Sequence, residues 1–138
     1  TILGTGGGGA LGQIIKDSGL GTYIAEGLSQ TAIPIIILPL IISTLMRFIQ
    51  GSGTVAMTTA ACISAPIIVA SGVSPLLGSI ACCVGSLFFG YFNDSYFWVV
   101  NRTLGVKEAK DQLITWSVTS TIAWAVGVVE VLVLSFFM

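Results

Sequence analysis

The sequence predicts an all-α integral membrane protein. Three observations support this fold class: few charges, apolar runs of helix length, and polar residues that interrupt those runs. The 138 residues are 54% apolar and 8% charged, with a mean hydropathy of +1.00. A soluble domain has about 25% charged residues, so five basic and six acidic side chains are too few to give a globule a solvated surface. We therefore expect the lipid bilayer to surround this chain.

The composition also excludes several classes of function. Histidine, the commonest general base and a frequent metal ligand, is absent from the sequence. No nucleophile–base pair or metal-ligand cluster stands out, so we expect neither an enzyme nor a bound cofactor or metal. A net charge of -1 offers no basic stripe for nucleic acid. Cys62, Cys82 and Cys83 lie inside apolar runs and predict no disulfide framework.

Residues 1–30 predict a glycine-rich start followed by an amphipathic helix. Gly4–Gly9 formally matches the G-x-G-x-x-G dinucleotide fingerprint. A true fingerprint follows a strand in a parallel sheet, whereas here apolar helices follow, and close backbone packing is the better interpretation. The chain starts at Thr1 rather than at a methionine. We therefore expect it to be the C-terminal part of a longer protein.

Residues 31–70 predict a re-entrant helical hairpin. The apolar runs Ile33–Phe48 and Val55–Ala70 flank a polar, glycine-containing connector. Each run has 16 residues and would measure about 24 Å as a helix. That is slightly shorter than the helix of roughly 20 residues that spans the hydrocarbon core of a membrane. Irregular backbone at membrane depth is tolerated where protein or a watery cavity surrounds it. Two ordinary spanning helices with a tight outside turn remain the alternative.

Three further elements follow the hairpin. Residues 75–101 predict a spanning helix that is broken at Asn93–Ser95. Residues 105–114 predict a short charged amphipathic helix, and residues 115–138 predict a last membrane span. Arg102, Lys107 and Lys110 cluster in one short connector, which the positive-inside rule places in the cytoplasm. The last span would then run outward, and the hairpin would enter from the periplasmic face.

Arg47 is the first candidate for a binding residue. An arginine at membrane depth costs about 2.5–3.5 kcal/mol on insertion scales, so it needs a partner. A guanidinium is planar, permanently charged and able to bind a carboxylate with two parallel hydrogen bonds. Arg47 is therefore a candidate receptor for an anionic substrate group. A snorkelling arginine at the membrane interface is the alternative.

The connector beside Arg47 supplies the second group of candidates. Glycines let the backbone approach a ligand, and the amide and hydroxyl side chains offer neutral donors and acceptors. The second hairpin helix would begin here, with its positive dipole end directed into the site. The alternative is a simple turn between helices. The candidate residues are Gln50, Gly51, Ser52, Gly53 and Thr54.

Asn93, Asp94 and Ser95 form the third group, because Asp94 interrupts an otherwise apolar run. An acidic residue inside a membrane segment is by default a functional candidate. Asp94 is a candidate proton carrier, a candidate hydrogen-bond partner for substrate hydroxyls, or a structural partner of Arg102. We assign no functional role to Glu130, which lies in the last span.

These stretches resemble the C-terminal third of the gluconate permease (GntP) family of the ion transporter superfamily. The resemblance is carried by GGGGALGQIIKDSGLG, RFIQGSGTVAMTT, YFNDSYFWVVNRTLGV and LITWSVTSTI, and covers essentially the whole chain. It implies two inverted repeats, each with a re-entrant hairpin and a discontinuous helix, of which this chain is most of the second. The sequence departs from the family pattern at Ser120, where many members carry an acid, and at Cys82–Cys83.

The resemblance implies a multi-pass symporter of the bacterial inner membrane that takes up gluconate or a related sugar acid with protons, and it suggests a homodimer. The candidate residues named above would be the second repeat's share of the substrate site. A sodium-coupled or amino-acid-selective relative, such as a D-serine carrier, is one alternative. A non-transporting membrane scaffold is the other. The expected partners are a small carboxylate, protons or sodium, and the bilayer, but no nucleic acid.

Overall fold

The structure, a computed structural model, describes Ile14, Asp17, Ser18 and residues 34–137. The described part of the chain is helical without β-strands, which confirms the all-α class for that part. The predicted glycine-rich start and amphipathic helix over residues 1–30 lie outside it, apart from those three residues. The elements are α3 (Ile37–Gln50), α4 (Gly53–Ala70), α5 (Pro75–Gly85), α6 (Ser95–Thr103), α7 (Ala109–Leu113), η1 (Ile114–Val118) and α8 (Thr119–Leu134).

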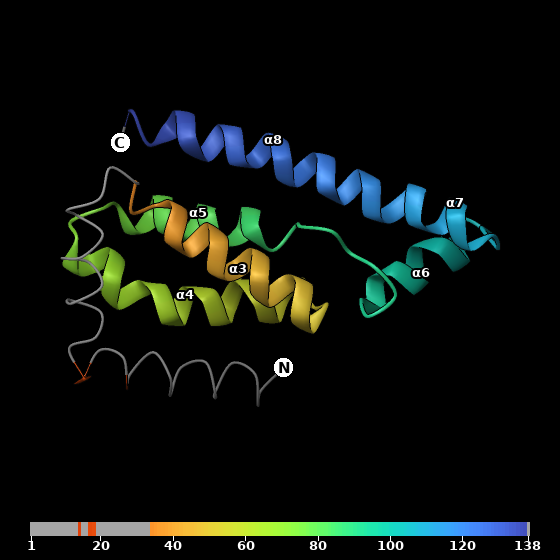
Figure 1. Ribbon diagram of the computed structural model, residues 1–138, viewed down its shortest axis with the longest axis horizontal. Helices are drawn as coiled ribbons and strands as arrows, with labels where there is room; N and C mark the ends of the chain where they lie inside the picture. The colour runs from red at the N-terminus through yellow and green to blue at the C-terminus, as the bar shows by residue number, and fades with distance from the viewer. Residues whose placement is uncertain (1–13, 15–16, 19–33, 138) are drawn as a thin grey trace.

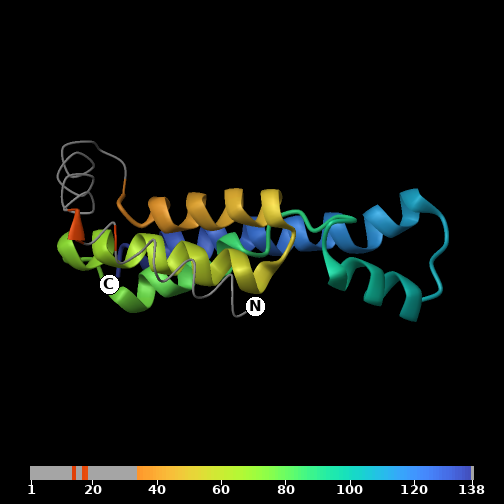
Figure 2. The ribbon, with the colours of Figure 1, turned by 90° about the horizontal axis from the view of Figure 1, so that it is seen from below.

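Helices α3, α4 and α5 pack against one another, and α8 lies along α5 (Figures 1 and 2). The apolar core cluster lies between α3, α5 and α8 and consists of Ile36, Leu40, Leu77, Ala81, Val84 and Val131. Gly85 allows close contact between α3 and α5, since a Cβ there would lie 2.6 Å from the Leu40 carbonyl oxygen and from Ser43 Cβ. This bundle supports one end of α8, while α6 lies beside η1 near the other end (Figure 1).

A two-residue turn connects α3 to α4. Gly51 adopts the left-handed conformation with φ +75° and donates its N–H to the Arg47 carbonyl, which ends α3. Ser52 then caps α4 by accepting the Val55 N–H. The turn is shorter than the predicted connector: Gln50 is the last residue of α3, and Gly53 and Thr54 form the first turn of α4.

The predicted break in the third apolar run is present, but it begins earlier than expected. The sequence predicts helix up to Phe92, whereas α5 ends at Gly85 and residues 86–94 are not helical. Side chains from other elements bind the carbonyl groups of Phe88 and Gly90, which replaces the hydrogen bonds of a helix. Asp94 caps α6 by accepting the Tyr96 N–H through Oδ1 at 3.0 Å.

The last helix differs from the prediction in its start. A separate charged helix over residues 105–114 was expected, but residues 105–108 are irregular and α7 continues through the π-helical turn η1 into α8. No glycine or proline interrupts residues 109–126, so the backbone hydrogen bonds continue through that junction. The charged residues Lys110 and Asp111 therefore belong to the first turn of the last helix.

Two of the described helices are long and apolar enough to cross a membrane: Gly53–Ala70, with 18 residues, and the continuous helix Ala109–Leu134, with 26. Large apolar side chains lie exposed along the described helices, among them Ile49, Val69 and Val129. Cys62, Cys82 and Cys83 are free thiols.

Candidate functional site

Arg47 lies in the last turn of α3 and is 4% exposed. Its guanidinium donates hydrogen bonds to three places: Nη1 to the Gly51 carbonyl, Nε to the Phe88 carbonyl at 3.2 Å, and Nη2 to Asp94 Oδ2 at 2.6 Å. One side chain therefore connects the turn between α3 and α4 to the non-helical segment between α5 and α6.

Asp94 is the charge partner that the burial of Arg47 requires. The two side chains are 5% and 8% exposed and form an ion pair at 2.6 Å. Burial strengthens the attraction between the charges and makes either charge costly without the other. Pairing of Asp94 with Arg102, which the sequence left open, is not observed, and Arg102 is exposed.

The last helix contacts the same ion pair through Trp116. The Trp116 indole N–H donates to Asp94 Oδ2 at 3.3 Å, and the ring packs on Tyr96 with centroids 5.2 Å apart. The adjoining Gly90 is held on both sides, since its N–H donates to Ser120 Oγ at 3.2 Å and its carbonyl accepts from Ser117 Oγ. The last helix therefore fixes both the non-helical segment and the acid that ends it.

The turn after α3 and the non-helical segment lie in direct contact. A Cβ at Gly51 would lie 2.6 Å from the Asn93 carbonyl oxygen, so contact distance as well as φ requires glycine there. The Phe48 carbonyl accepts from the Tyr91 hydroxyl at 3.0 Å and from Asn93 Nδ2 at 3.4 Å. Two breaks in helical structure, more than 40 residues apart in the sequence, are thus brought together.

An open cleft of about 870 Å³ lies where these elements meet. The first turns of α4 and α6 both line it, as does one face of η1 and α8. Arg47 and Asp94 are the charged residues among its described lining residues. The predicted candidates in the lining are Arg47, Gln50, Ser52, Gly53, Thr54, Asn93, Asp94 and Ser95. Gly51 is the predicted candidate outside the lining, and it packs behind the cleft against Asn93.

The sequence interpretation missed one wall of this cleft. Thr115, Trp116, Thr119 and Ser120 of the last helix line it, although they were read as part of an ordinary span. Hydroxyls recur there at a spacing of four residues, which brings side chains to one helix face. That recurrence was the available signal.

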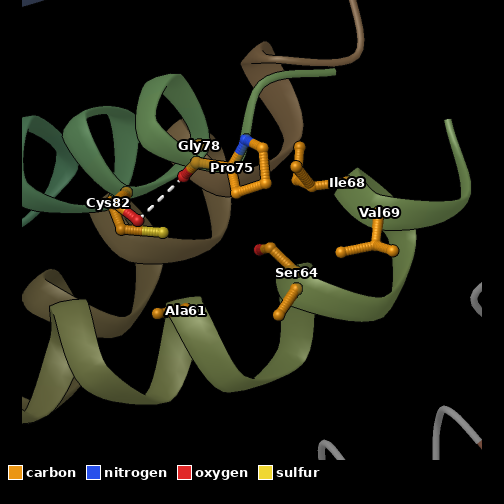
Figure 3. Close-up of a pocket in the computed structure, with 9 residues that line it drawn as sticks. Ala61, Ser64, Ile68, Val69, Pro75, Gly78 and Cys82 are labelled. Carbon is orange, nitrogen blue, oxygen red and sulfur yellow. Dashed lines mark hydrogen bonds between the residues drawn. The ribbon is translucent and has the colours of Figure 1, made fainter. Parts of the chain in front are cut away.

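A second, smaller cavity of about 110 Å³ lies between α4 and α5 (Figure 3). Ala61, Ser64 and Ile68 of α4 face Pro75, Gly78 and Cys82 of α5 there. The buried Ser64 hydroxyl has no hydrogen-bond partner within the described residues. The described residues that line this cavity include no charged side chain, which distinguishes it from the cleft beside Arg47.

Apolar helices with breaks at a shared polar cleft are the architecture of a membrane transport protein. The comparison with known families makes this specific. The GntP family of permeases matches residues 1–137, and the chain belongs to that family. The family consists of permeases and not of enzymes.

Several curated relatives support this assignment. The chain is 55% identical to an uncharacterized permease of Haemophilus influenzae over 95% of its own length and 27% of the relative. It is 38% identical to the high-affinity gluconate transporter of Escherichia coli, over 97% of this chain and 30% of that protein. The low-affinity gluconate transporter of Escherichia coli is 35% identical over 93% and 29%. The chain thus spans less than a third of each relative's length, and no solved structure matches it.

Proposed function

We propose that this chain is part of a proton-coupled symporter that carries gluconate or a related small sugar acid across a bacterial inner membrane. The observation that carries the proposal is the buried Arg47–Asp94 pair in a cleft whose other described lining residues are uncharged. The substrate class is supported by the relatives named as gluconate transporters.

Arg47 binds the substrate carboxylate in this proposal. A guanidinium has five N–H groups in a planar fork, and each of the three nitrogens of Arg47 donates one hydrogen bond within the described residues. Nη1 and Nη2 each retain a second N–H, which together suit a carboxylate. Gly53 and Thr54, in the first turn of α4, line the same cleft, and the free N–H groups of a helix N-terminus favour an anion.

Asp94 carries the proton. Together Arg47 and Asp94 are neutral, so a monoanionic substrate adds one uncompensated negative charge beside this buried pair. Such a charge is costly at low dielectric. A proton on Asp94 removes that cost, which links the uptake of one proton to the binding of one monoanion.

The membrane arrangement in this proposal follows the family resemblance. Helices α3 and α4 form the re-entrant hairpin, and α5 and α6 are the halves of a discontinuous spanning helix. The continuous helix α7–η1–α8 runs outward from the cytoplasmic connector that carries Arg102 and Lys107. The remainder of the full-length protein supplies the inverted first repeat, and two copies form a dimer.

The test uses the full-length permease in liposomes, numbered as here, with proton and sodium gradients imposed separately. Wild type is expected to accumulate labelled gluconate with the proton gradient alone. Arg47→Gln should abolish uptake, while Asp94→Asn should abolish accumulation. Arg102→Gln, the matched control on an exposed arginine, should resemble wild type.

Accumulation that requires sodium and ignores protons would refute the proposed coupling and favour the sodium-coupled alternative. Uptake of D-serine in place of gluconate would refute the substrate class. Full activity in both the Arg47 and Asp94 variants would mean that the binding site lies elsewhere. Absence of any solute uptake by the folded wild type would favour the scaffold alternative.

A further inference from the structure

The last helix presents a row of polar side chains to the cleft, and the binding scheme above does not use them. The cleft-lining residues of this helix are Thr115, Trp116, Thr119, Ser120 and Ala123. Their spacing places them on one face of the helix. At 1.5 Å per residue this face extends for about 12 Å along the cleft.

The hydroxyls in this row have unused hydrogen-bonding capacity. Thr119 Oγ1 donates to the Thr115 carbonyl at 2.5 Å, and its oxygen can still accept. The Thr115 hydroxyl makes no hydrogen bond within the described residues and can therefore both donate and accept. The hydroxyl of Thr54, which also lines the cleft from α4, is likewise without a partner in that part of the chain.

Trp116 positions this row relative to the charged end of the cleft. Its indole N–H reaches Asp94 Oδ2 at 3.3 Å, and Asp94 in turn contacts Arg47. Thr115 and Thr119 line the same cleft as Arg47, so a ligand whose carboxylate lies on Arg47 can extend its carbon chain along them.

We propose that Thr115 and Thr119 recognise the hydroxyl groups of a polyhydroxy carboxylate whose charged end lies on Arg47. This inference rests on the proposed function and adds the residues that select a sugar acid over a simple carboxylate. The Thr119 oxygen accepts from a substrate hydroxyl, and the Thr115 hydroxyl donates to one or accepts from it. A site built to pair with a hydroxyl discriminates against an analogue that lacks it, because its own polar groups are then left unpaired.

Threonines in apolar helices also occur without any binding role, since they can bond their own backbone. Thr121 is the matched example: its hydroxyl donates to the Ser117 carbonyl at 2.7 Å, and it lies outside the cleft lining. A valine at that position removes the same kind of group from the same helix. It therefore serves as the control.

The experiment measures competition against labelled gluconate uptake by the full-length protein, with unlabelled gluconate and a series of monodeoxygluconates as competitors. Thr115→Val and Thr119→Val should each weaken the apparent affinity for gluconate about tenfold. Each should leave at least one deoxy analogue unaffected, because that analogue already lacks the hydroxyl concerned. Thr115→Ser and Thr119→Ser should restore the wild-type pattern, and Thr121→Val should retain it.

Equal weakening for gluconate and every analogue would assign the threonines a structural role and overturn the inference. Unchanged gluconate affinity in both valine variants would overturn it as well. These outcomes are distinct from a failure of the proposed function, in which the folded wild-type protein itself would not take up gluconate.

Discussion

Neutralising one member of the Arg47–Asp94 pair is expected to destabilise the protein more than neutralising both. The ion pair is 2.6 Å long and its side chains are 5% and 8% exposed. Loss of one partner leaves the other charge buried and uncompensated, which costs about 3–5 kcal/mol. Arg47→Gln isolates the carboxylate, and Asp94→Asn isolates the guanidinium.

The asparagine variant separates charge from helix capping. Asp94 Oδ1 accepts the Tyr96 N–H at the start of α6, and asparagine caps helices about as well as aspartate. In the double variant no buried charge remains and the two amides can hydrogen-bond, so we expect a cost of about 1–3 kcal/mol. The double variant should therefore cost at least about 3 kcal/mol less than the sum of the single variants.

Denaturant unfolding of the purified full-length protein in detergent, followed by tryptophan fluorescence, measures these differences. Trp116 contacts Asp94 and reports on the site directly. Costs that add to within about 0.5 kcal/mol would mean that the two residues are not energetically coupled. That result would refute the view of Arg47 and Asp94 as one buried unit.

Two predictions concern glycines. Gly90→Ala should weaken gluconate binding about tenfold in the uptake competition assay, because a Cβ there would lie 2.7 Å from Arg47 Nη2. The control is Gly72→Ala, at a glycine with φ +72° and open space around it, which should lower stability without changing affinity. Equal affinities for gluconate in the two variants would contradict the argument. Gly85→Ala should lower the free energy of unfolding by about 1–3 kcal/mol, since its Cβ would lie 2.6 Å from Ser43 Cβ; a wild-type unfolding midpoint would show that α3 and α5 separate without cost.

The charged part of the site could be predicted because the cost of burying a charge is a property of the local sequence. Arg47 and Asp94 interrupt apolar runs, and each needs compensation inside a membrane or a core. That reasoning predicted that Arg47 has a partner and that Asp94 belongs with the candidate site. It offered Arg102 as a structural partner of Asp94, whereas Asp94 pairs with Arg47, because the choice of partner depends on how the helices pack.

The extent of the break after α5 could not be predicted for a different reason. The sequence from Ser86 to Phe92 is apolar and compatible with helix. The carbonyl groups that leave the helix are bound instead by Arg47 and Ser117, which are 41 and 27 residues away from their partners. Hydrogen bonds over such separations depend on the packed structure and leave no local pattern.

The cleft wall formed by Thr115, Trp116, Thr119 and Ser120 was missed because hydroxyl groups add little free-energy cost to an apolar helix. Thr119 and Ser120 bond to carbonyl groups about one turn earlier in their own helix, so these residues leave the helix as apolar on average as a simple span. A charge at membrane depth needs a partner, whereas a hydroxyl that is hydrogen-bonded to the backbone of its own helix does not. The spacing of the hydroxyls groups them on one helix face, but only the packing of α8 against the other helices turns that face toward the cleft beside Arg47.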